Sequence, residues 1–242
     1  RVSIRIRKIK TNKMIHPEIY SYFNDKESWK RKYMRPEALS KEWDMMLEEV
    51  GPDVYQFPLF KEELCSKLIE EAEATQSWTH KRHAFYPTTD MLVETFGFND
   101  IYNDIMDEYI MDAARHIYQL DGGNWEKGNV YSENFMIRYS PEEQGHLSLH
   151  YDQSRVSCNV ALNNDFEGGG TYFSRHKVLA KATGTGYVTF HPGQITHKHG
   201  GMPTNKGTRY IIVSFMNDDK NREDHINDLE RFANENGFYN DK

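Results

Sequence analysis

Cysteine and long hydrophobic runs are both scarce in this 242-residue chain. It has two cysteines, Cys65 and Cys158, which excludes a disulfide framework and a cysteine-rich zinc site. Cys65 lies in a helix-like run and Cys158 in a strand-like run, so we expect two small buried side chains rather than a disulfide. The longest apolar run, Tyr210 to Met216, is about seven residues, far short of the roughly 18 that a membrane helix needs. The sequence therefore predicts no transmembrane segment.

An excess of positive charge is also missing. The chain has 30 basic and 37 acidic side chains and a formal net charge of −7, which argues against nucleic-acid binding and suits a cationic substrate. No signal peptide is visible and the chain starts at Arg1 without a methionine, so we expect a fragment of a longer protein. Aromatic residues are 13%, enough to fill a core and to argue against disorder.

The first half of the chain is mostly helical in pattern. Apolar residues at helical spacing predict helices over 61–74 and 97–120, and the charged segment 26–49 is helix-compatible with a break near Pro36. A short strand is expected over 53–60 and an edge strand in the first dozen residues. Within one domain, 1–242, we assign 1–125 to a helical and strand support region.

The second half reads as strands separated by glycine, proline and asparagine turns. The predicted strands are 130–139, 146–152, 156–162, 171–173, 186–190 and 209–216. Short strands at this spacing are typical of a β-sandwich or jelly-roll barrel, so the fold class is α+β. We assign 126–218 to this β core and 219–242 to a C-terminal helix.

Histidine carries the first functional signal. His150-Tyr151-Asp152 places an imidazole and a carboxylate two apart on a predicted strand, where both side chains point to the same face. Alone, the triplet carries little information. A second histidine about 50 residues later would complete the two-histidine, one-carboxylate set of non-haem Fe(II) oxygenases, which leaves metal positions open for reactants.

Two histidines compete for that third position. His199 is ten residues before Arg209, and His197 is nine before Lys206. Lys206 lies in a turn-like stretch, whereas Arg209 opens the apolar strand that ends at Met216. We therefore prefer His199 as the ligand, with His197 holding the geometry or merely packed.

Arg209 needs an anionic partner, because a buried unpaired guanidinium is costly. A dicarboxylate co-substrate would supply one through a charge-assisted contact. An ordinary salt bridge to an acidic side chain is the alternative.

Residues 130–218 resemble the catalytic domain of the procollagen lysyl hydroxylases, which are Fe(II)/2-oxoglutarate dioxygenases. The resemblance is weaker upstream. The matching stretches are Arg138-Tyr139, His150-Tyr151-Asp152, 159–163, 166–170, His191-Pro192-Gly193, 196–199, 207–211 and 213–215.

The resemblance implies a double-stranded β-helix, the jelly-roll core of this family, flanked by N-terminal helices. It implies that His150, Asp152 and His199 hold Fe(II) and that Arg209 binds 2-oxoglutarate. Asn159 and Tyr139 match side chains near that co-substrate.

It also implies hydroxylation of peptidyl lysine to 5-hydroxylysine in collagen-like X-Lys-Gly sequences. The reaction would use O₂, with ascorbate keeping the iron reduced, in a homodimer. The exposed aromatics Phe232, Phe238 and Tyr239 are compatible with a dimer contact. Cellular family members act in the endoplasmic reticulum lumen, and a viral member would act in a host-cell compartment or the virion.

Two alternatives stay open. A prolyl hydroxylase of the same superfamily would share every iron and co-substrate residue, and a non-catalytic collagen-binding module could retain a vestigial metal site. The acidic group that would attract a lysine ammonium is not identifiable from the sequence. His146 and His191 are expected to be structural or solvated, and the glycines 168–170 to form a tight turn rather than a phosphate loop.

Overall fold

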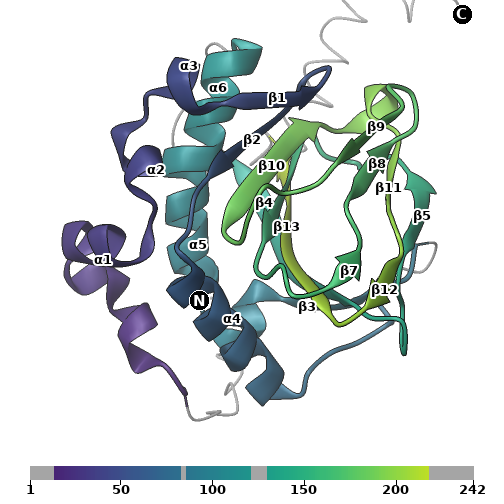
Figure 1. Ribbon diagram of the computed structural model, residues 1–242. Helices are drawn as coiled ribbons and strands as arrows, with labels where there is room; N and C mark the ends of the chain where they lie inside the picture. The colour runs from purple at the N-terminus through teal and green to yellow at the C-terminus, as the bar shows by residue number, and fades with distance from the viewer. Residues whose placement is uncertain (1–13, 83–85, 121–129, 218–242) are drawn as a thin grey trace, which may run out of the picture.

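The computed structural model describes residues 14–82, 86–120 and 130–217. The helices of the first half lie against one face of a β-sheet, and smaller sheets lie beyond its other face (Figure 1). The predicted edge strand in the first dozen residues and the predicted C-terminal helix lie outside the described residues. Within the described ranges, no helix is long and apolar enough to cross a membrane.

The helical part begins with η1 (Pro17–Asn24), α1 (Lys26–Tyr33), α2 (Pro36–Ser40) and α3 (Trp43–Met46). The break expected near Pro36 falls between α1 and α2. Asp25 caps α1 by accepting a hydrogen bond from the Ser28 backbone N–H at 3.0 Å. The helix expected over 61–74 is α4 (Glu62–Thr75).

The helix expected over 97–120 is a continuous run with a π-helical centre. It consists of α5 (Asn99–Ile105), η3 (Met106–Ile110) and α6 (Met111–Tyr118), preceded by the short η2 (Val93–Phe96). The buried apolar side chains of this run and of α4 belong to the largest of the three hydrophobic clusters in the described chain.

Seven strands form the larger sheet, in the order β1-β2-β10-β6-β13-β4-β3. Their bounds are β1 (Glu48–Gly51), β2 (Val54–Pro58), β3 (Thr89–Leu92), β4 (Tyr131–Tyr139), β6 (Val156–Ala161), β10 (Tyr187–Pro192) and β13 (Arg209–Asn217). All adjacent pairs are antiparallel.

The smaller sheets close the barrel on the opposite side (Figure 1). The four-stranded sheet has the order β5-β11-β8-β9 and the two-stranded sheet pairs β12 with β7. Their strands are β5 (Leu147–His150), β7 (Glu167–Gly168), β8 (Thr171–Phe173), β9 (Val178–Ala180), β11 (His199–Gly201) and β12 (Thr204–Lys206), with η5 (Gln194–Thr196) just before β11. The predicted α+β jelly roll is the observed architecture. The six strands predicted in the second half of the chain correspond within a few residues to β4, β5, β6, β8, β10 and β13.

Strand β13 divides its side chains between the two layers. Ile212, Ser214 and Met216 are fully buried on the helical side, where the Ser214 hydroxyl donates to Tyr102 Oη at 3.2 Å. Arg209 and Val213 belong to the alternate set, which faces the interior of the barrel. Period-two alternation in one strand therefore serves both the hydrophobic core and the cavity.

Candidate metal centre and co-substrate cavity

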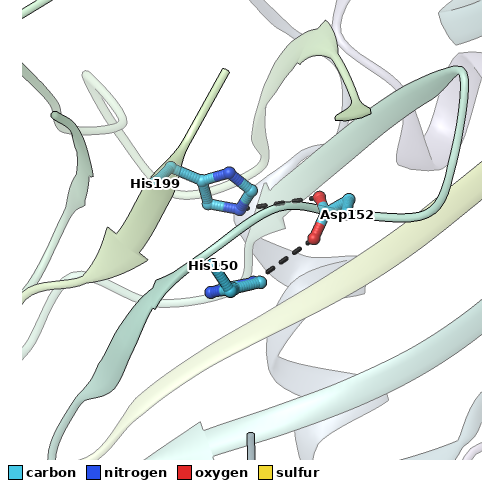
Figure 2. A group of neighbouring side chains, drawn as sticks. All are labelled: His150, Asp152 and His199. Atoms are coloured by element: carbon cyan, nitrogen blue, oxygen red, sulfur yellow. Dashed lines mark ion pairs between the residues drawn. The ribbon is translucent and has the colours of Figure 1, made fainter. Parts of the chain in front are cut away.

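Three side chains converge beside strands β5 and β11 of the four-stranded sheet. His150 ends β5, His199 begins β11, and the two residues are paired across these antiparallel strands. Asp152 lies two residues past β5, not within a strand as the sequence pattern suggested. Ligand atoms of the three residues lie within 4.8 Å of one another, and all three are buried (Figure 2).

Both imidazoles turn the same nitrogen toward the carboxylate. His150 Nε2 lies 3.3 Å from Asp152 Oδ1, and His199 Nε2 lies 3.5 Å from Oδ2 (Figure 2). Backbone carbonyls hold the other nitrogen of each ring: His150 Nδ1 donates to Ser148 at 2.8 Å and His199 Nδ1 donates to His197 at 2.9 Å. In the neutral rings, each Nε2 then offers its lone pair to a metal.

The surroundings of Asp152 also favour the protonation state that binds a metal. Burial alone would raise its pKa, but the contact with His150, the nearby His199 and His191, and a hydrogen bond from Ser157 at 2.6 Å together lower it well below the ordinary value. Asp152 is therefore anionic at neutral pH, and this donor set fits a divalent cation such as Fe(II).

The other histidines of the 191–199 segment lie behind the triad. His197 donates from Nε2 to the Pro52 carbonyl at 3.0 Å, which ties η5 and β11 to the β1–β2 hairpin. His191 is fully buried, its ring centroid lies 4.8 Å from that of His199, and burial lowers its pKa to about 3. Both side chains therefore pack as neutral rings, and His146 is exposed.

The triad opens into a cavity of about 930 Å³ along the inner face of the large sheet. Its described walls include the predicted site residues Arg209, Asn159 and Tyr139 together with the triad. The middle of the cavity is apolar, with side chains from β4 and β13. They are Phe135, Ile137, Ile211 and Val213.

Arg209 stands at one end of this cavity and is 8% exposed. Its partner across the sheet is Tyr139, whose ring centroid lies 5.5 Å from the guanidinium carbon. Among the described residues, no carboxylate forms an ion pair with Arg209. Desolvation lowers the pKa of its guanidinium, and desolvation raises the pKa of Tyr139 to about 12. A buried cation and a neutral phenol that face a cavity form a receptor for a carboxylate.

The glycines 168–170 leave space for the Arg209 side chain. Gly169 has a φ of +65°, and a Cβ there would lie 3.0 Å from Arg209 Cδ and 2.8 Å from the Phe166 ring. The run therefore makes the expected turn and also leaves room for the guanidinium side chain.

Sequence reasoning missed Ser157, Glu133 and Arg82. Ser157 points to the same side of β6 as Asn159, so strand alternation alone could have identified it. Glu133 lies on the same side of β4 as Tyr139, so alternation along the predicted strand 130–139 also points to it. The cavity position of Arg82 depends on contacts between distant segments, and the local sequence gives no sign of it.

Comparisons with known proteins show which proteins this chain is similar to. The OGFOD2-like domain family matches residues 5–123. The chain is 34% identical over 215 residues to the rat multifunctional procollagen lysine hydroxylase and glycosyltransferase LH3, covering 84% of this chain and 28% of that protein. It is 35% identical over 214 residues to bovine procollagen-lysine,2-oxoglutarate 5-dioxygenase 1, covering 84% of this chain and 29% of that one. The chain thus spans under a third of the length of these relatives.

Solved structures show the same fold at low sequence identity. A prolyl-4-hydroxylase from Pseudomonas putida has a TM-score of 0.51 at 14% identity, over 68% of this chain and 92% of that one. A non-heme alpha ketoglutarate dependent carbocyclase from nogalamycin biosynthesis has a TM-score of 0.52 at 10% identity, over 72% and 85%. The resemblance seen in the sequence is confirmed: this chain is a relative of the procollagen lysyl hydroxylases and has the jelly-roll fold of the 2-oxoglutarate/Fe(II) oxygenases.

Proposed function

We propose that this chain hydroxylates peptidyl lysine to 5-hydroxylysine in collagen-like X-Lys-Gly sequences, with Fe(II), 2-oxoglutarate and O₂. The observation that carries the proposal is one cavity that joins the buried triad to the buried Arg209, for which the described residues provide no carboxylate partner. The names of the relatives, which include lysine hydroxylases, support the choice of substrate.

His150, Asp152 and His199 would hold the metal through two Nε2 atoms and a carboxylate oxygen. Three protein ligands leave room on an octahedral ion for a bidentate keto acid and for O₂. When bound, Fe(II) and 2-oxoglutarate supply the oxidising power, because oxidative decarboxylation of the co-substrate is coupled to hydroxylation of a C–H bond.

Arg209 would bind the distal carboxylate of 2-oxoglutarate. The guanidinium can donate two parallel hydrogen bonds, and the phenol of Tyr139 can donate a third because it stays neutral at physiological pH. Asn159 lies on the same wall and offers an amide to the co-substrate. Fixing both ends of the keto acid would orient its reactive end toward the triad.

The apolar walls between Arg209 and the triad would exclude water from the reacting atoms. Ile137, Ile211 and Val213 are all at least nine-tenths buried, and they line the middle of the cavity. Exclusion of water strengthens the polar contacts of the site and protects reactive species. Ascorbate as the external reductant is part of the same proposal.

Mass spectrometry of collagen-like peptides after incubation with Fe(II), 2-oxoglutarate and ascorbate tests the proposal. One peptide has lysine, and a matched peptide has proline in place of lysine. We expect a mass increase of one oxygen on the lysine peptide with stoichiometric succinate, and none with the Asp152→Ala variant. Oxygen addition on the proline peptide alone would indicate a prolyl hydroxylase. Absence of turnover on both would favour a binding module.

A further inference from the structure

One acidic side chain in the described lining of the cavity is not part of the metal centre. Among the described residues that line the cavity, the carboxylates are Asp152 and Glu133. Asp152 belongs to the triad. Glu133 lies in β4, and its side chain is 42% exposed, so a solute that enters the cavity can reach it.

Sheet register places Glu133 level with the metal centre. Phe215 of β13 is paired with Glu133 of β4 on one side and with Ser157 of β6 on the other. Residues paired directly across adjacent strands point to the same face, so these three side chains form one row. Ser157 donates to Asp152 Oδ2 at 2.6 Å, and two strand spacings of about 4.8 Å separate the backbone of Glu133 from that of Ser157.

A cation already occupies the Glu133 carboxylate in this structure. The Arg82 guanidinium bridges Glu133 and the fully buried Asp90, whose Oδ1 lies 2.8 Å from Arg82 Nη1. The same guanidinium carbon lies 5.1 Å from the centroid of the Phe135 ring, which lines the cavity. A carboxylate and an aromatic face together make a receptor for a cation.

The position of Glu133 is suited to distinguish a lysine side chain from an uncharged one. The ammonium nitrogen of a lysine side chain is bonded to C6, two bonds from C5, so a group that binds the ammonium must lie close to the end of the cavity that holds the metal. Proline has no cation that could take the place of the Arg82 guanidinium on Glu133. On the basis of the proposed function, we propose that Glu133, with the Phe135 ring beside it, binds the ammonium of the substrate lysine and selects lysine over uncharged side chains.

Peptide binding without turnover tests this assignment. Fluorescence anisotropy would measure the Kd of two labelled collagen-like peptides for the protein with Fe(II) and 2-oxoglutarate under anaerobic conditions. One peptide has a central lysine, and the other has norleucine, which lacks the ammonium. The variants are Glu133→Gln, Glu133→Asp and, as a matched control, Glu142→Gln in an exposed turn outside the cavity lining.

We expect Glu133→Gln to weaken binding of the lysine peptide roughly tenfold to hundredfold, the range for a lost charge-assisted hydrogen bond. The norleucine peptide should bind with unchanged Kd, and Glu133→Asp should recover part of the lysine affinity. An equal loss for both peptides, no loss for either, or the same loss in Glu142→Gln would overturn the assignment. Melting temperature and Fe(II) affinity, measured on each variant, identify a folding defect.

The test of the Glu133 assignment can fail independently of the test of the proposed function. If the wild-type protein hydroxylates lysine peptides while Glu133→Gln retains their full affinity, the ammonium assignment fails and the function stands. If no peptide is hydroxylated by the wild-type protein, the function fails, whatever the Kd values are.

Discussion

The Ser157 hydroxyl donates a hydrogen bond of 2.6 Å to Oδ2 of Asp152, the oxygen that lies 3.5 Å from His199 Nε2. Ser157 is 2% exposed, and its own oxygen lies 2.5 Å from the Ser154 hydroxyl. The two serines therefore fix the orientation of a carboxylate that stands outside any strand. This relationship gives the first prediction.

Ser157→Ala should weaken Fe(II) binding roughly tenfold or more, because a hydrogen bond that orients a metal-binding carboxylate is worth about that much in affinity. The melting temperature of the metal-free protein should change little. Fe(II) affinity measured by anaerobic titration checks this, with Ser148→Ala as the control, since Ser148 contacts His150 through its backbone carbonyl. Equal affinities in both variants would contradict it.

Alanine at His150, Asp152 or His199 should abolish turnover while the fold survives, because each removes one of three converging ligands. His197→Ala should retain measurable activity, since its backbone carbonyl, which holds His199, remains. Succinate release and circular dichroism on all four variants check the prediction. Full loss at His197 with activity retained at His199 would exchange their roles.

Arg209→Ala should raise the KM for 2-oxoglutarate roughly tenfold to hundredfold, the value of a charge-assisted hydrogen bond of about 1.5–3 kcal/mol. Fe(II) affinity and melting temperature should be nearly unchanged, because no described carboxylate is left unpaired. Arg209→Lys should recover part of the loss, since lysine keeps the charge without the two-pronged geometry. A large drop in melting temperature with an unchanged KM would indicate a structural ion pair.

Both cysteines should be inert in the folded protein. Burial raises the pKa of Cys65 and of Cys158 to about 12, so the reactive thiolate is absent at pH 8. A thiol reagent should label neither cysteine in native protein at pH 8 and both in denaturant. Fast labelling of native protein would contradict the burial.

The raised pKa values of the two thiols also make the stability of the protein depend on pH. The folded-state pKa lies above the value of about 8.5 for an exposed thiol, so the unfolded chain loses its protons first. The thiol contribution to stability is complete below that value and is lost as the pH rises toward 12. Cys65→Ala should therefore show a smaller fall in melting temperature between pH 8 and 10 than the wild-type protein.

The homodimer expected from the family resemblance has its own test. Light scattering at micromolar concentration should give twice the chain mass of 28.5 kDa. The aromatics Phe232, Phe238 and Tyr239, expected at the contact, lie outside the described residues. Serine at all three should shift the mass toward the monomer if they form the interface. A fully active wild-type monomer would contradict the dimer.

Strong local patterns predicted the framework of the fold. The long apolar run of β13 and the helical spacing of apolar residues in α4 were enough to predict these two elements from their own residues. The His150-x-Asp152 triplet brought two residues of the site to notice, although Asp152 lies just past the end of β5 and not within it.

Strands that depend on their partners were not predictable. β3 is four residues long and contains Asp90, a residue type depleted in strands, and it forms by pairing with the edge of β4. β11 is His199-Gly200-Gly201, a sequence with low strand propensity that pairs on both sides. Alternation puts Glu133 on the same face of β4 as Tyr139, but the pairing of β4 with β13 and of β13 with β6 is what places it level with Ser157.

The two-sided use of β13 limits how this site can change. A one-residue slip in the register of the strand would exchange its faces, sending Arg209 toward the helices and Ile212 toward the cavity, and a residue inserted or deleted within the strand would do this to the side chains on one side of the change. Substitution at one alternate position leaves the other face untouched. New substrate preferences on this sheet can therefore arise through point substitutions, whereas length variation is confined to the loops that connect the strands.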